Sequence, residues 1–256
     1  MDRYKYLTVD IKNNKIAIVE MNSNQPLNLL SSGFISELMT ACVALNEDEA
    51  IHVVILTGGK TSFIAGTDIK EMTGLSVSQA FDLVTKIKAL QEIIMESSKP
   101  FIAAISGYCL GGGFELALVC DFRVASSDAV FGLPQINLGI IPGGGGVTRL
   151  VEIAGQTAAR KMVLTGDLIP ATRALDWNII SDLTDSPVDG ALVIAHSLAS
   201  KSKRALATAK RLLNQKMLSS NQNHAYQEMQ AFTLLFDYPD SVEGMGAFLE
   251  GRKPSF

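Results

Sequence analysis

Glycines and one acidic residue stand close together in the apolar stretch Gly107–Asp121, which reads GYCLGGGFELALVCD. Gly111, Gly112 and Gly113 end a predicted strand and begin a predicted helix, and glycine lets a ligand approach the main chain closely. A helix start presents unpaired N–H groups and a partial positive charge, which suit a developing oxyanion. Glu115 lies three residues after Gly112 on the same helix face, where it can act as an acid or base. A glycine turn for close packing, with Glu115 as a solvated first-turn acid, explains the stretch equally well.

A second turn of this kind is predicted at Gly66, within Ser62–Met72 (SFIAGTDIKEM). The residues before Gly66 favour a strand and those after it favour a helix, so the turn should leave N–H groups near Thr67 and Asp68 free. An ordinary strand-to-helix turn with Thr67 or Asp68 as the N-cap is an equally good interpretation of these residues.

A long irregular loop is predicted at Gly132–Gly146 (GLPQINLGIIPGGGG). It contains Pro134, Pro142 and five glycines from Gly139 onward, which disfavour regular structure. Such loops often carry function, although a flexible connection is the simpler interpretation. The apolar residues between the glycines favour a packed loop of defined shape.

Composition argues against several classes of function. The 256 residues are 47% hydrophobic and 19% charged with a formal net charge of -4, and no basic run supports nucleic-acid binding. The uncharged stretch Pro100–Phe114 is too short to span a bilayer, and the N-terminus lacks a basic-then-apolar signal, so we expect no membrane contact. Three cysteines without C-x-x-C spacing fit a reducing cytosol. The scattered His52, His196 and His224 favour surface or strand-end positions over a metal cluster or a catalytic triad.

Apolar strands alternate with amphipathic helices along the chain, which predicts an α/β fold with substantial parallel pairing. The predicted strands are 6–9, 15–21, 53–57, 101–106, 122–126, 129–132 and 178–180. The predicted helices are 31–46, 78–97, 147–154, 157–165, 170–177, 191–200, 203–218, 222–236 and 241–250. Everything after about residue 188 is thus predicted helical, to pack on the core or on a neighbouring subunit.

Four blocks of the sequence resemble the crotonase (enoyl-CoA hydratase/isomerase) superfamily. They are Phe63–Met72 (FIAGTDIKEM), Lys99–Ala117 (KPFIAAISGYCLGGGFELA), Phe131–Leu150 (FGLPQINLGIIPGGGGVTRL) and the C-terminal EGMGAFLEGRKPSF. They occur in the family's order and spacing and extend over essentially the whole chain. The resemblance implies a crotonase-type β/α spiral core over residues 1–187, which binds acyl-CoA and carries catalysis. It also implies a C-terminal helical trimerisation region over residues 188–256.

The chemistry implied by the resemblance is stabilisation of a thioester enolate by two backbone N–H groups, which by motif belong to Thr67 and Gly112. Thr67 replaces the family's common Ala, a change that a backbone donor tolerates. Loss of one oxyanion donor typically costs about 2.7–4 kcal/mol, so the pair can supply much of the catalysis. Glu115 matches the carboxylate that positions and activates water, and Gly143 matches a loop position whose N–H can orient that water.

Further residues are assigned to the substrate or its CoA by their place in the family motifs. They are Gln25, Leu27, Ala65, Asp68, Ile69, Lys70, Gly111, Phe248 and Lys253. Gln25 stands where relatives often have Lys or Arg, which would weaken one phosphate contact. The charge of Lys70 either assists phosphate binding or is simply solvated. Phe248 and Lys253 match a region that can reach the CoA of an adjacent subunit.

The chain departs from the family's hydratases at Gln135, where they carry a second carboxylate that exchanges the proton at the substrate's alpha carbon. An amide has no proton to exchange near neutral pH, and general acid–base catalysis is worth about 10²–10⁴-fold. Three interpretations follow. The first is an enoyl-CoA hydratase-like lyase with Glu115 as the main acid–base group. The second is a one-base isomerase, decarboxylase or thioester hydrolase, and the third is a weakly active CoA-thioester-binding scaffold subunit.

The resemblance also sets expectations about partners. We expect an acyl-CoA thioester as substrate, no permanently bound cofactor, no metal, and a homotrimer or a hexamer built as a dimer of trimers. We expect a cytoplasmic protein that binds neither nucleic acid nor a membrane. Acyl chain length and pathway are not readable from the residues.

Overall fold

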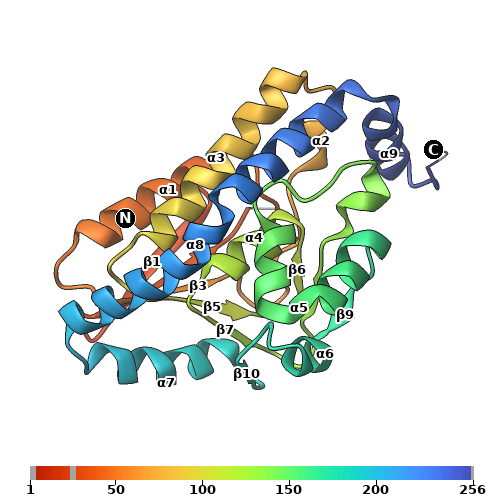
Figure 1. The fold of residues 1–256 in the computed structure, drawn as a ribbon. Helices are drawn as coiled ribbons and strands as arrows, with labels where there is room; N and C mark the ends of the chain where they lie inside the picture. Colours follow the sequence, from red (N-terminus) through yellow and green to blue (C-terminus); the bar gives the residue numbers. More distant parts are fainter. Residues whose placement is uncertain (1–3, 24–26, 255–256) are drawn as a thin grey trace.

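The computed structural model describes residues 4–23 and 27–254, with the side chains of 215–228 and 231 excepted. It has helices on both faces of a largely parallel sheet, with a second, smaller sheet at one end (Figure 1). The predicted α/β class is therefore confirmed.

The main sheet has the strand order β1-β2-β3-β5-β7-β10. Its strands are β1 (Leu7–Lys12), β2 (Ile16–Met21), β3 (Val53–Thr57), β5 (Phe101–Ile105), β7 (Phe122–Ala125) and β10 (Asp182–Leu183). β1 and β2 form the predicted antiparallel hairpin, and the other neighbours pair in parallel. Every residue of β3 and β5 is buried, as expected for parallel strands covered on both faces.

The smaller sheet has the order β4-β6-β8-β9. Its strands are β4 (Ser62–Ile64), β6 (Tyr108–Leu110), β8 (Val130–Gly132) and β9 (Ile169–Pro170). β4, β6 and β8 each follow directly on a strand of the main sheet, so the chain repeats a strand–strand–helix unit and winds as a spiral. β4 and β6 are parallel neighbours, so their carboxyl ends lie side by side.

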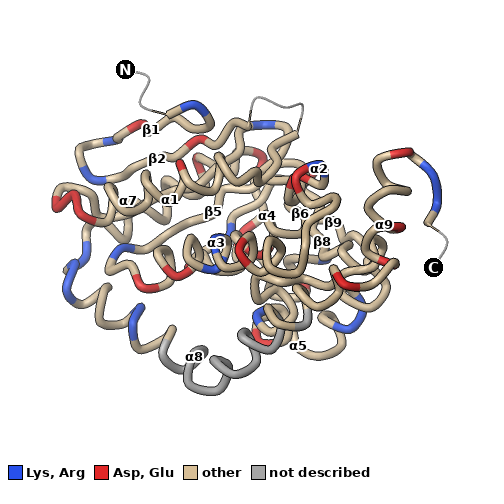
Figure 2. Tube along the Cα trace, turned by 90° about the horizontal axis from the view of Figure 1, so that it is seen from above, with Lys and Arg blue, Asp and Glu red and all other residues tan. Residues whose placement is uncertain are grey.

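The helices enclose both sheets. They are α1 (Ser32–Glu47), α2 (Ile69–Met72), α3 (Val77–Met95), α4 (Gly112–Val119), α5 (Gly146–Thr165), α6 (Ala171–Asp176), α7 (Pro187–Ala199), α8 (Lys203–Leu234) and α9 (Pro239–Leu249), with short 3-10 helices η1 (Pro134–Leu138) and η2 (Leu235–Asp237). Figure 1 shows α7 along one face of the main sheet and α1, α3 and α8 on the other. Figure 2 shows α9 and the C-terminus at one end of the molecule. No helix in the described ranges has both the length and the apolarity needed to cross a bilayer.

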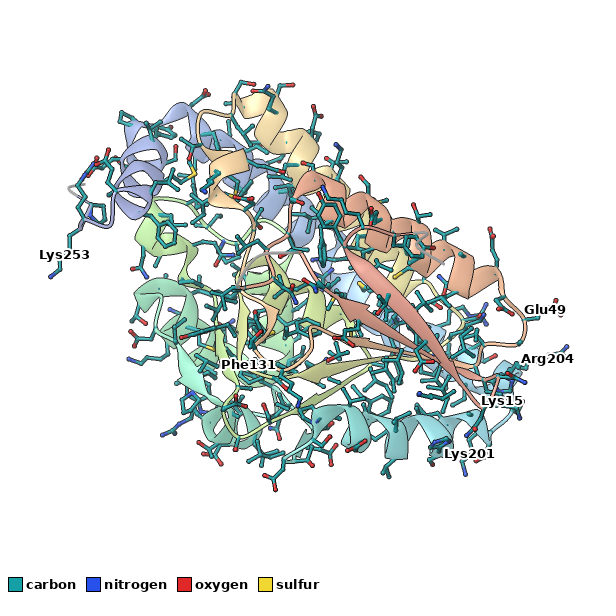
Figure 3. All side chains as sticks on the ribbon, turned by 180° about the vertical axis from the view of Figure 1, so that it is seen from behind. Lys15, Glu49, Phe131, Lys201, Arg204 and Lys253 are labelled. Atoms are coloured by element: carbon teal, nitrogen blue, oxygen red, sulfur yellow. The ribbon has the colours of Figure 1, made fainter. Side chains whose placement is uncertain are left out.

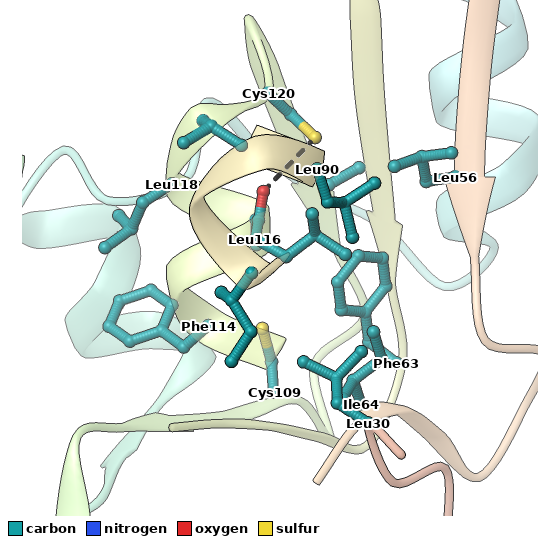
Figure 4. Close-up of a cluster of buried hydrophobic side chains, with 14 of the residues drawn as sticks. Leu30, Leu56, Phe63, Ile64, Leu90, Cys109, Phe114, Leu116, Leu118 and Cys120 are labelled. Atoms are coloured by element: carbon teal, nitrogen blue, oxygen red, sulfur yellow. Dashed lines mark hydrogen bonds between the residues drawn. The ribbon is translucent and has the colours of Figure 1, made fainter. Parts of the chain in front are cut away.

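Helix α4 lies in the middle of the core, and all of its residues are buried. Figure 4 shows the apolar side chains of α4 among residues of β4, β6 and α3. The Cys120 thiol donates a hydrogen bond to the Leu116 carbonyl oxygen. Gly113 is required at this position, because a Cβ there would lie 2.3 Å from the Ile64 carbonyl oxygen. The first turn of α4 is therefore held tightly against β4, which fixes the positions of Gly112 and Glu115.

Two details of the predicted secondary structure are wrong. Residues 178–180 form a turn rather than a strand, because Asn178 adopts a left-handed φ of 59° and the N–H groups of Ile179 and Ile180 both donate to the Ala174 carbonyl. The predicted helices 203–218 and 222–236 are one backbone helix, α8, continued by η2. The polar residues at 219–221 do not interrupt it, since the segment lacks Gly and Pro. The predicted division at residues 187 and 188 stays a prediction.

Candidate functional site

The turn at Gly66 places Thr67 at the wall of a cavity. Thr67 forms a parallel bridge with Leu30, in which the Leu30 N–H donates to the Gly66 carbonyl and the Asp68 N–H donates to the Leu30 carbonyl, both at 2.9 Å. The N–H groups of a strand residue and its neighbours alternate in direction, so the Thr67 N–H points away from Leu30. Gly66 itself has φ of 133°, which a residue with a side chain rarely adopts.

The turn at Gly111 lies directly against the turn at Gly66. Gly111 has φ of 50°, and a Cβ there would lie 3.7 Å from the Gly66 Cα atom. A Cβ on Gly112 would lie 2.9 Å from the Thr67 hydroxyl oxygen. Gly112 opens α4, and no described residue accepts a hydrogen bond from its N–H or from that of Thr67. Thr67 and Gly112 therefore lie side by side, each with an N–H group that has no acceptor among the described residues, which is the arrangement that an oxyanion hole requires.

Beside these turns lies a cavity of about 480 Å³. Its lining residues are Leu27, Ala65, Gly66, Thr67, Ile69, Met72, Leu83, Val84, Ile87, Tyr108, Leu110, Gly111, Gly112, Glu115, Pro134, Gln135, Asn137, Leu138, Ile140, Gly143, Gly144, Phe232 and Phe248. Among these described residues Glu115 is the only carboxylate, and none is Lys, Arg or His. The cavity suits an apolar, uncharged group next to a single acid.

The Glu115 side chain is 3% exposed, and its Oε1 atom accepts hydrogen bonds from the N–H groups of Gly144 at 2.8 Å and Gly146 at 2.9 Å. Burial raises the pKa of Glu115 to about 7. The Gly146 N–H, the Arg149 charge and the Gly144 N–H lower it, but their combined effect is smaller than that of burial. A carboxyl group with this pKa can both give and accept a proton near neutral pH. No described residue donates to its second oxygen, Oε2, so this oxygen is available to a substrate.

The glycine loop before α5 fits around that carboxylate. A Cβ on Gly144 would lie 3.2 Å from the Glu115 Oε2 atom, and one on Gly146 would lie 2.9 Å from Oε1. A Cβ on Gly143 would lie 2.6 Å from the Phe232 ring. Glycine at these positions is thus explained by close approach to the site, and the loop is packed, as predicted.

Gln135 lies in the first turn of η1, facing the same cavity from the other side. A Cβ on Gly111 would lie 3.5 Å from the Gln135 Nε2 atom, so the amide is beside the oxyanion turn. The Oε1 atom of Gln135 is buried and has no hydrogen-bond donor among the described residues. A buried acceptor without a donor is costly, so this atom is suited to receive a hydrogen bond from a bound water or substrate.

The structure brings most of the predicted site residues together around the cavity. They are Leu27, Ala65, Thr67, Ile69, Gly111, Gly112, Glu115, Gln135, Gly143 and Phe248. Asp68 caps α2 by accepting from the Lys70 N–H at 3.0 Å, and Lys70 itself is exposed. Lys253 is exposed and points away from the body of the molecule (Figure 3). Gln25 lies outside the described residues.

The three histidines stay apart from the site. His52 precedes β3 and is partly buried, and His196 is exposed on α7, while the side chain of His224 lies outside the described residues. No group of three His, Cys, Asp or Glu residues in the described part of the chain is placed to hold a metal ion.

Several site residues are not evident from the motifs. One apolar wall of the cavity is formed by Leu83, Val84 and Ile87 of α3 with Phe232 of α8, positions that periodicity explains equally well as helix core. Gln91 is a polar residue at a position that helix periodicity places on the buried face of α3, and a polar side chain on such a face indicates a buried hydrogen bond. It is 1% exposed and accepts a hydrogen bond from Arg149.

Comparison with known proteins agrees with this geometry. The family model described as enoyl-CoA hydratase/isomerase matches residues 11–256. A mitochondrial enoyl-CoA hydratase of Pongo abelii is 38% identical, over 96% of this chain and 84% of that protein. An enoyl-CoA hydratase structure from Mycobacterium avium subsp. paratuberculosis superposes with a TM-score of 0.87 at 27% identity, covering 98% of both chains. A methylmalonyl-CoA decarboxylase structure does so with a TM-score of 0.86 at 32% identity, covering 99% of this chain and 98% of the other. The chain belongs to the enoyl-CoA hydratase/isomerase family.

Proposed function

We propose that this enzyme adds water across the conjugated double bond of a 2-enoyl-CoA thioester, with Glu115 as its acid–base group. The observation that carries the proposal is the buried carboxyl of Glu115, the one acid among the described residues that line the cavity. It has a pKa of about 7 and lies one helical turn from the two apposed N–H groups of Thr67 and Gly112.

One carboxyl group, that of Glu115, both accepts the proton from water and donates the proton to C2. Ionised Glu115 accepts a proton from water through Oε2 as the water oxygen bonds to C3, and the double-bond electrons move toward the thioester carbonyl. The enolate oxygen receives hydrogen bonds from the Thr67 and Gly112 N–H groups. The enolate then takes the proton from Glu115 at C2, which returns the carboxylate and gives the 3-hydroxyacyl thioester.

Gln135 orients the water rather than exchanging a proton. Its buried Oε1 atom accepts a hydrogen bond from the O–H of the water that does not face Glu115. The Gly143 N–H is assigned to the same water. Loss of the family's second carboxylate then lowers the rate of protonation at C2, but leaves a complete route through Glu115.

The cavity favours an uncharged acyl group. Its acyl side is apolar, and Glu115 carries a negative charge above pH 7 with no cation among the described lining residues to offset it. A malonyl-type substrate that loses carbon dioxide would bring a second carboxylate to this place, where it is repelled. This supports hydration over decarboxylation.

The CoA portion is assigned to the rim formed by Leu27, Ala65, Ile69 and Phe248. Its phosphates are assigned to the exposed side chains of Lys70 and Lys253, the latter from an adjacent copy. Exposed apolar side chains on and before α9, including Tyr238, Val242 and Phe248, support assembly as a homotrimer or hexamer. The cytoplasmic location and the lack of a permanent cofactor stay predictions.

Double-bond isomerisation is the second candidate, because one carboxyl with a pKa of about 7 can also carry a proton from C4 to C2. The same oxyanion hole would serve the dienolate. Product identity separates the two reactions.

The absorbance of the conjugated thioester of crotonyl-CoA tests the proposal. We expect rapid loss of this absorbance with the wild type and none with Glu115→Gln. No loss with the wild type, combined with a gain in Gln135→Glu, would show that the natural reaction lies elsewhere. Tight binding of crotonyl-CoA without turnover in either protein would favour a scaffold role.

A further inference from the structure

The glycine loop around Glu115 is held from behind by one guanidinium group. The Arg149 Nη1 atom donates to the Gly144 carbonyl at 2.5 Å and to Gln91 Oε1 at 3.1 Å, and Nη2 donates to the Met95 sulfur at 3.4 Å. Gly145 adopts φ of 88°, and a Cβ there would lie 2.3 Å from Arg149 Nη1, so the loop rests directly on this side chain. The loop that donates to Glu115 through Gly144 and Gly146 is therefore anchored by α3 through Arg149.

Gln91 is built into this anchor. It is 1% exposed in the middle of α3, and its Oε1 atom accepts from Arg149 while its Nε2 atom is buried without a partner among the described residues. A Cβ on Gly144 would lie 2.9 Å from that Nε2 atom and 3.2 Å from Glu115 Oε2. Gln91, Gly144 and Glu115 thus meet at one point, although Gln91 does not line the cavity.

We propose that Arg149, locked by Gln91, is a positioning residue that shapes the Gly144–Gly146 loop around the Glu115 carboxylate and adjusts its affinity for a proton. The proposal rests on the proposed function in taking Glu115 as the acid–base group. Neither Arg149 nor Gln91 touches the substrate cavity.

Among the described residues, Arg149 is the cation whose charge acts on Glu115. α4 packs against α5, α3, β4 and β6, and α4 itself carries no other charged residue. Besides Arg149, α5 carries Glu152 and, beyond the break at Gly155, Arg160 and Lys161, whereas β6 has no Asp, Glu, Lys, Arg or His. The charged residues of α3 lie on its outer side, where Lys88 and Glu92 approach to 3.6 Å, and β4 has none. Those outer residues are Asp82, Lys86, Lys88 and Glu92.

Removing the guanidinium should make Glu115 harder to ionise. A nearby opposite charge typically lowers a carboxyl pKa by about 1–3 units, and the Arg149 charge lowers the pKa of Glu115, so Arg149→Met should raise the titration midpoint of Glu115 by about one pH unit. Arg149→Lys keeps a charge but loses the fork that grips Gly144 and Gln91, and should shift the midpoint less. Gln91→Leu removes no charge, yet frees Arg149 to move, and should shift the midpoint in the same direction by a smaller amount.

The test is an infrared titration of the Glu115 carboxyl band, identified by its absence in Glu115→Gln. It needs neither substrate nor turnover, so it stays informative if crotonyl-CoA proves not to be hydrated. Arg160→Met, an exposed arginine on the same helix, is the matched control and should not move the band. If Arg149→Met does not fold, Arg149→Lys and Gln91→Leu carry the test. Unchanged midpoints in the folded variants would overturn the proposal.

Hydration kinetics provide a second readout. A rise of one unit from a pKa of about 7 lowers the ionised fraction of Glu115 about fivefold at pH 7 but hardly at pH 9. Arg149→Met should therefore lose activity at pH 7 and recover most of it at pH 9. An equal loss at both pH values would mean that Arg149 only supports the fold.

Discussion

Replacing Glu115 by Gln should change how the stability of the protein depends on pH. The side chain is 3% exposed and its pKa is raised to about 7, chiefly by burial. Gln has nearly the same shape, and its carbonyl oxygen can still accept from the Gly144 and Gly146 N–H groups. The substitution therefore removes one titration from the folded protein while keeping its packing.

The magnitude follows from the difference between the folded and unfolded pKa values. The folded pKa of Glu115, about 7, is above its ordinary value of 4.5, so the neutral form is the one that folding favours. This contribution is complete below pH 4.5 and is lost as the pH rises through 7. At 1.36 kcal/mol per pH unit, the free energy of unfolding attributable to Glu115 falls by about 3 kcal/mol across that window.

Denaturant unfolding of the wild type and Glu115→Gln between pH 4.5 and 8.5 measures how much the Glu115 titration contributes to the free energy of unfolding. All other titrations are shared, so the difference between their free energies of unfolding isolates Glu115. We expect Glu115→Gln to gain about 3 kcal/mol relative to the wild type from the lowest to the highest pH. Glu47→Gln, at an exposed position ending α1, should show no such trend. A difference that does not change with pH would refute the assignment of a raised pKa to Glu115.

Three further substitutions probe the site and its support. Gly144→Ala places a Cβ 3.2 Å from the Glu115 carboxyl and should lower crotonyl-CoA hydration about 100-fold, as misplaced catalytic groups typically do. Phe232→Ala enlarges the cavity beside α3. Since each buried methylene is worth about 0.8 kcal/mol, two further methylenes of octenoyl-CoA buried in that space should raise its kcat/KM relative to crotonyl-CoA about 15-fold. Lys210→Met removes the ion-pair partner that lies 2.8 Å from Asp121 and should cost about 3 kcal/mol in denaturant unfolding.

Each of these has an outcome that contradicts it. Gly246→Ala, where a Cβ meets nothing within 4 Å, is the control for Gly144→Ala, and equal activity of the two would show that the loop has room. An unchanged chain-length ratio in Phe232→Ala would remove this ring from the acyl boundary. If adding Asp121→Asn to Lys210→Met restores no stability, the loss comes from packing rather than from an unpaired charge.

The parts of the site that were predictable from sequence are those made by backbone. The two glycine turns stand out because Gly66 and Gly111 adopt φ values that other residues rarely reach, and a parallel sheet then places them side by side. Helix spacing places Glu115 on the same face as the Gly112 N–H, and its burial in the structure decides against the alternative of a solvated acid. Local sequence patterns are therefore sufficient to predict the two turns and the position of the acid relative to them.

The remaining features depend on contacts between distant segments. Arg149 and Gln91 are 58 residues apart, and no local pattern indicates that they meet behind the glycine loop. Phe232 reaches the cavity from α8 for the same reason. The error at 178–180 has a local cause. Ile179 and Ile180 have high strand propensity, but they follow Asn178, whose left-handed conformation makes the segment a turn that ends α6. Asp68, in contrast, has a role that local sequence predicts, because it caps α2 as one of the two interpretations of this turn proposed.

The central claim is that Glu115 alone moves the proton at the alpha carbon. It can be tested with a substrate analogue that cannot be hydrated. Butyryl-CoA has no double bond, so NMR in D₂O follows only exchange of its C2 protons through the enolate. We predict exchange by the wild type, loss of exchange in Glu115→Gln, and retention in Gln135→Leu. Exchange that persists in Glu115→Gln would contradict the claim and assign the alpha proton to another group.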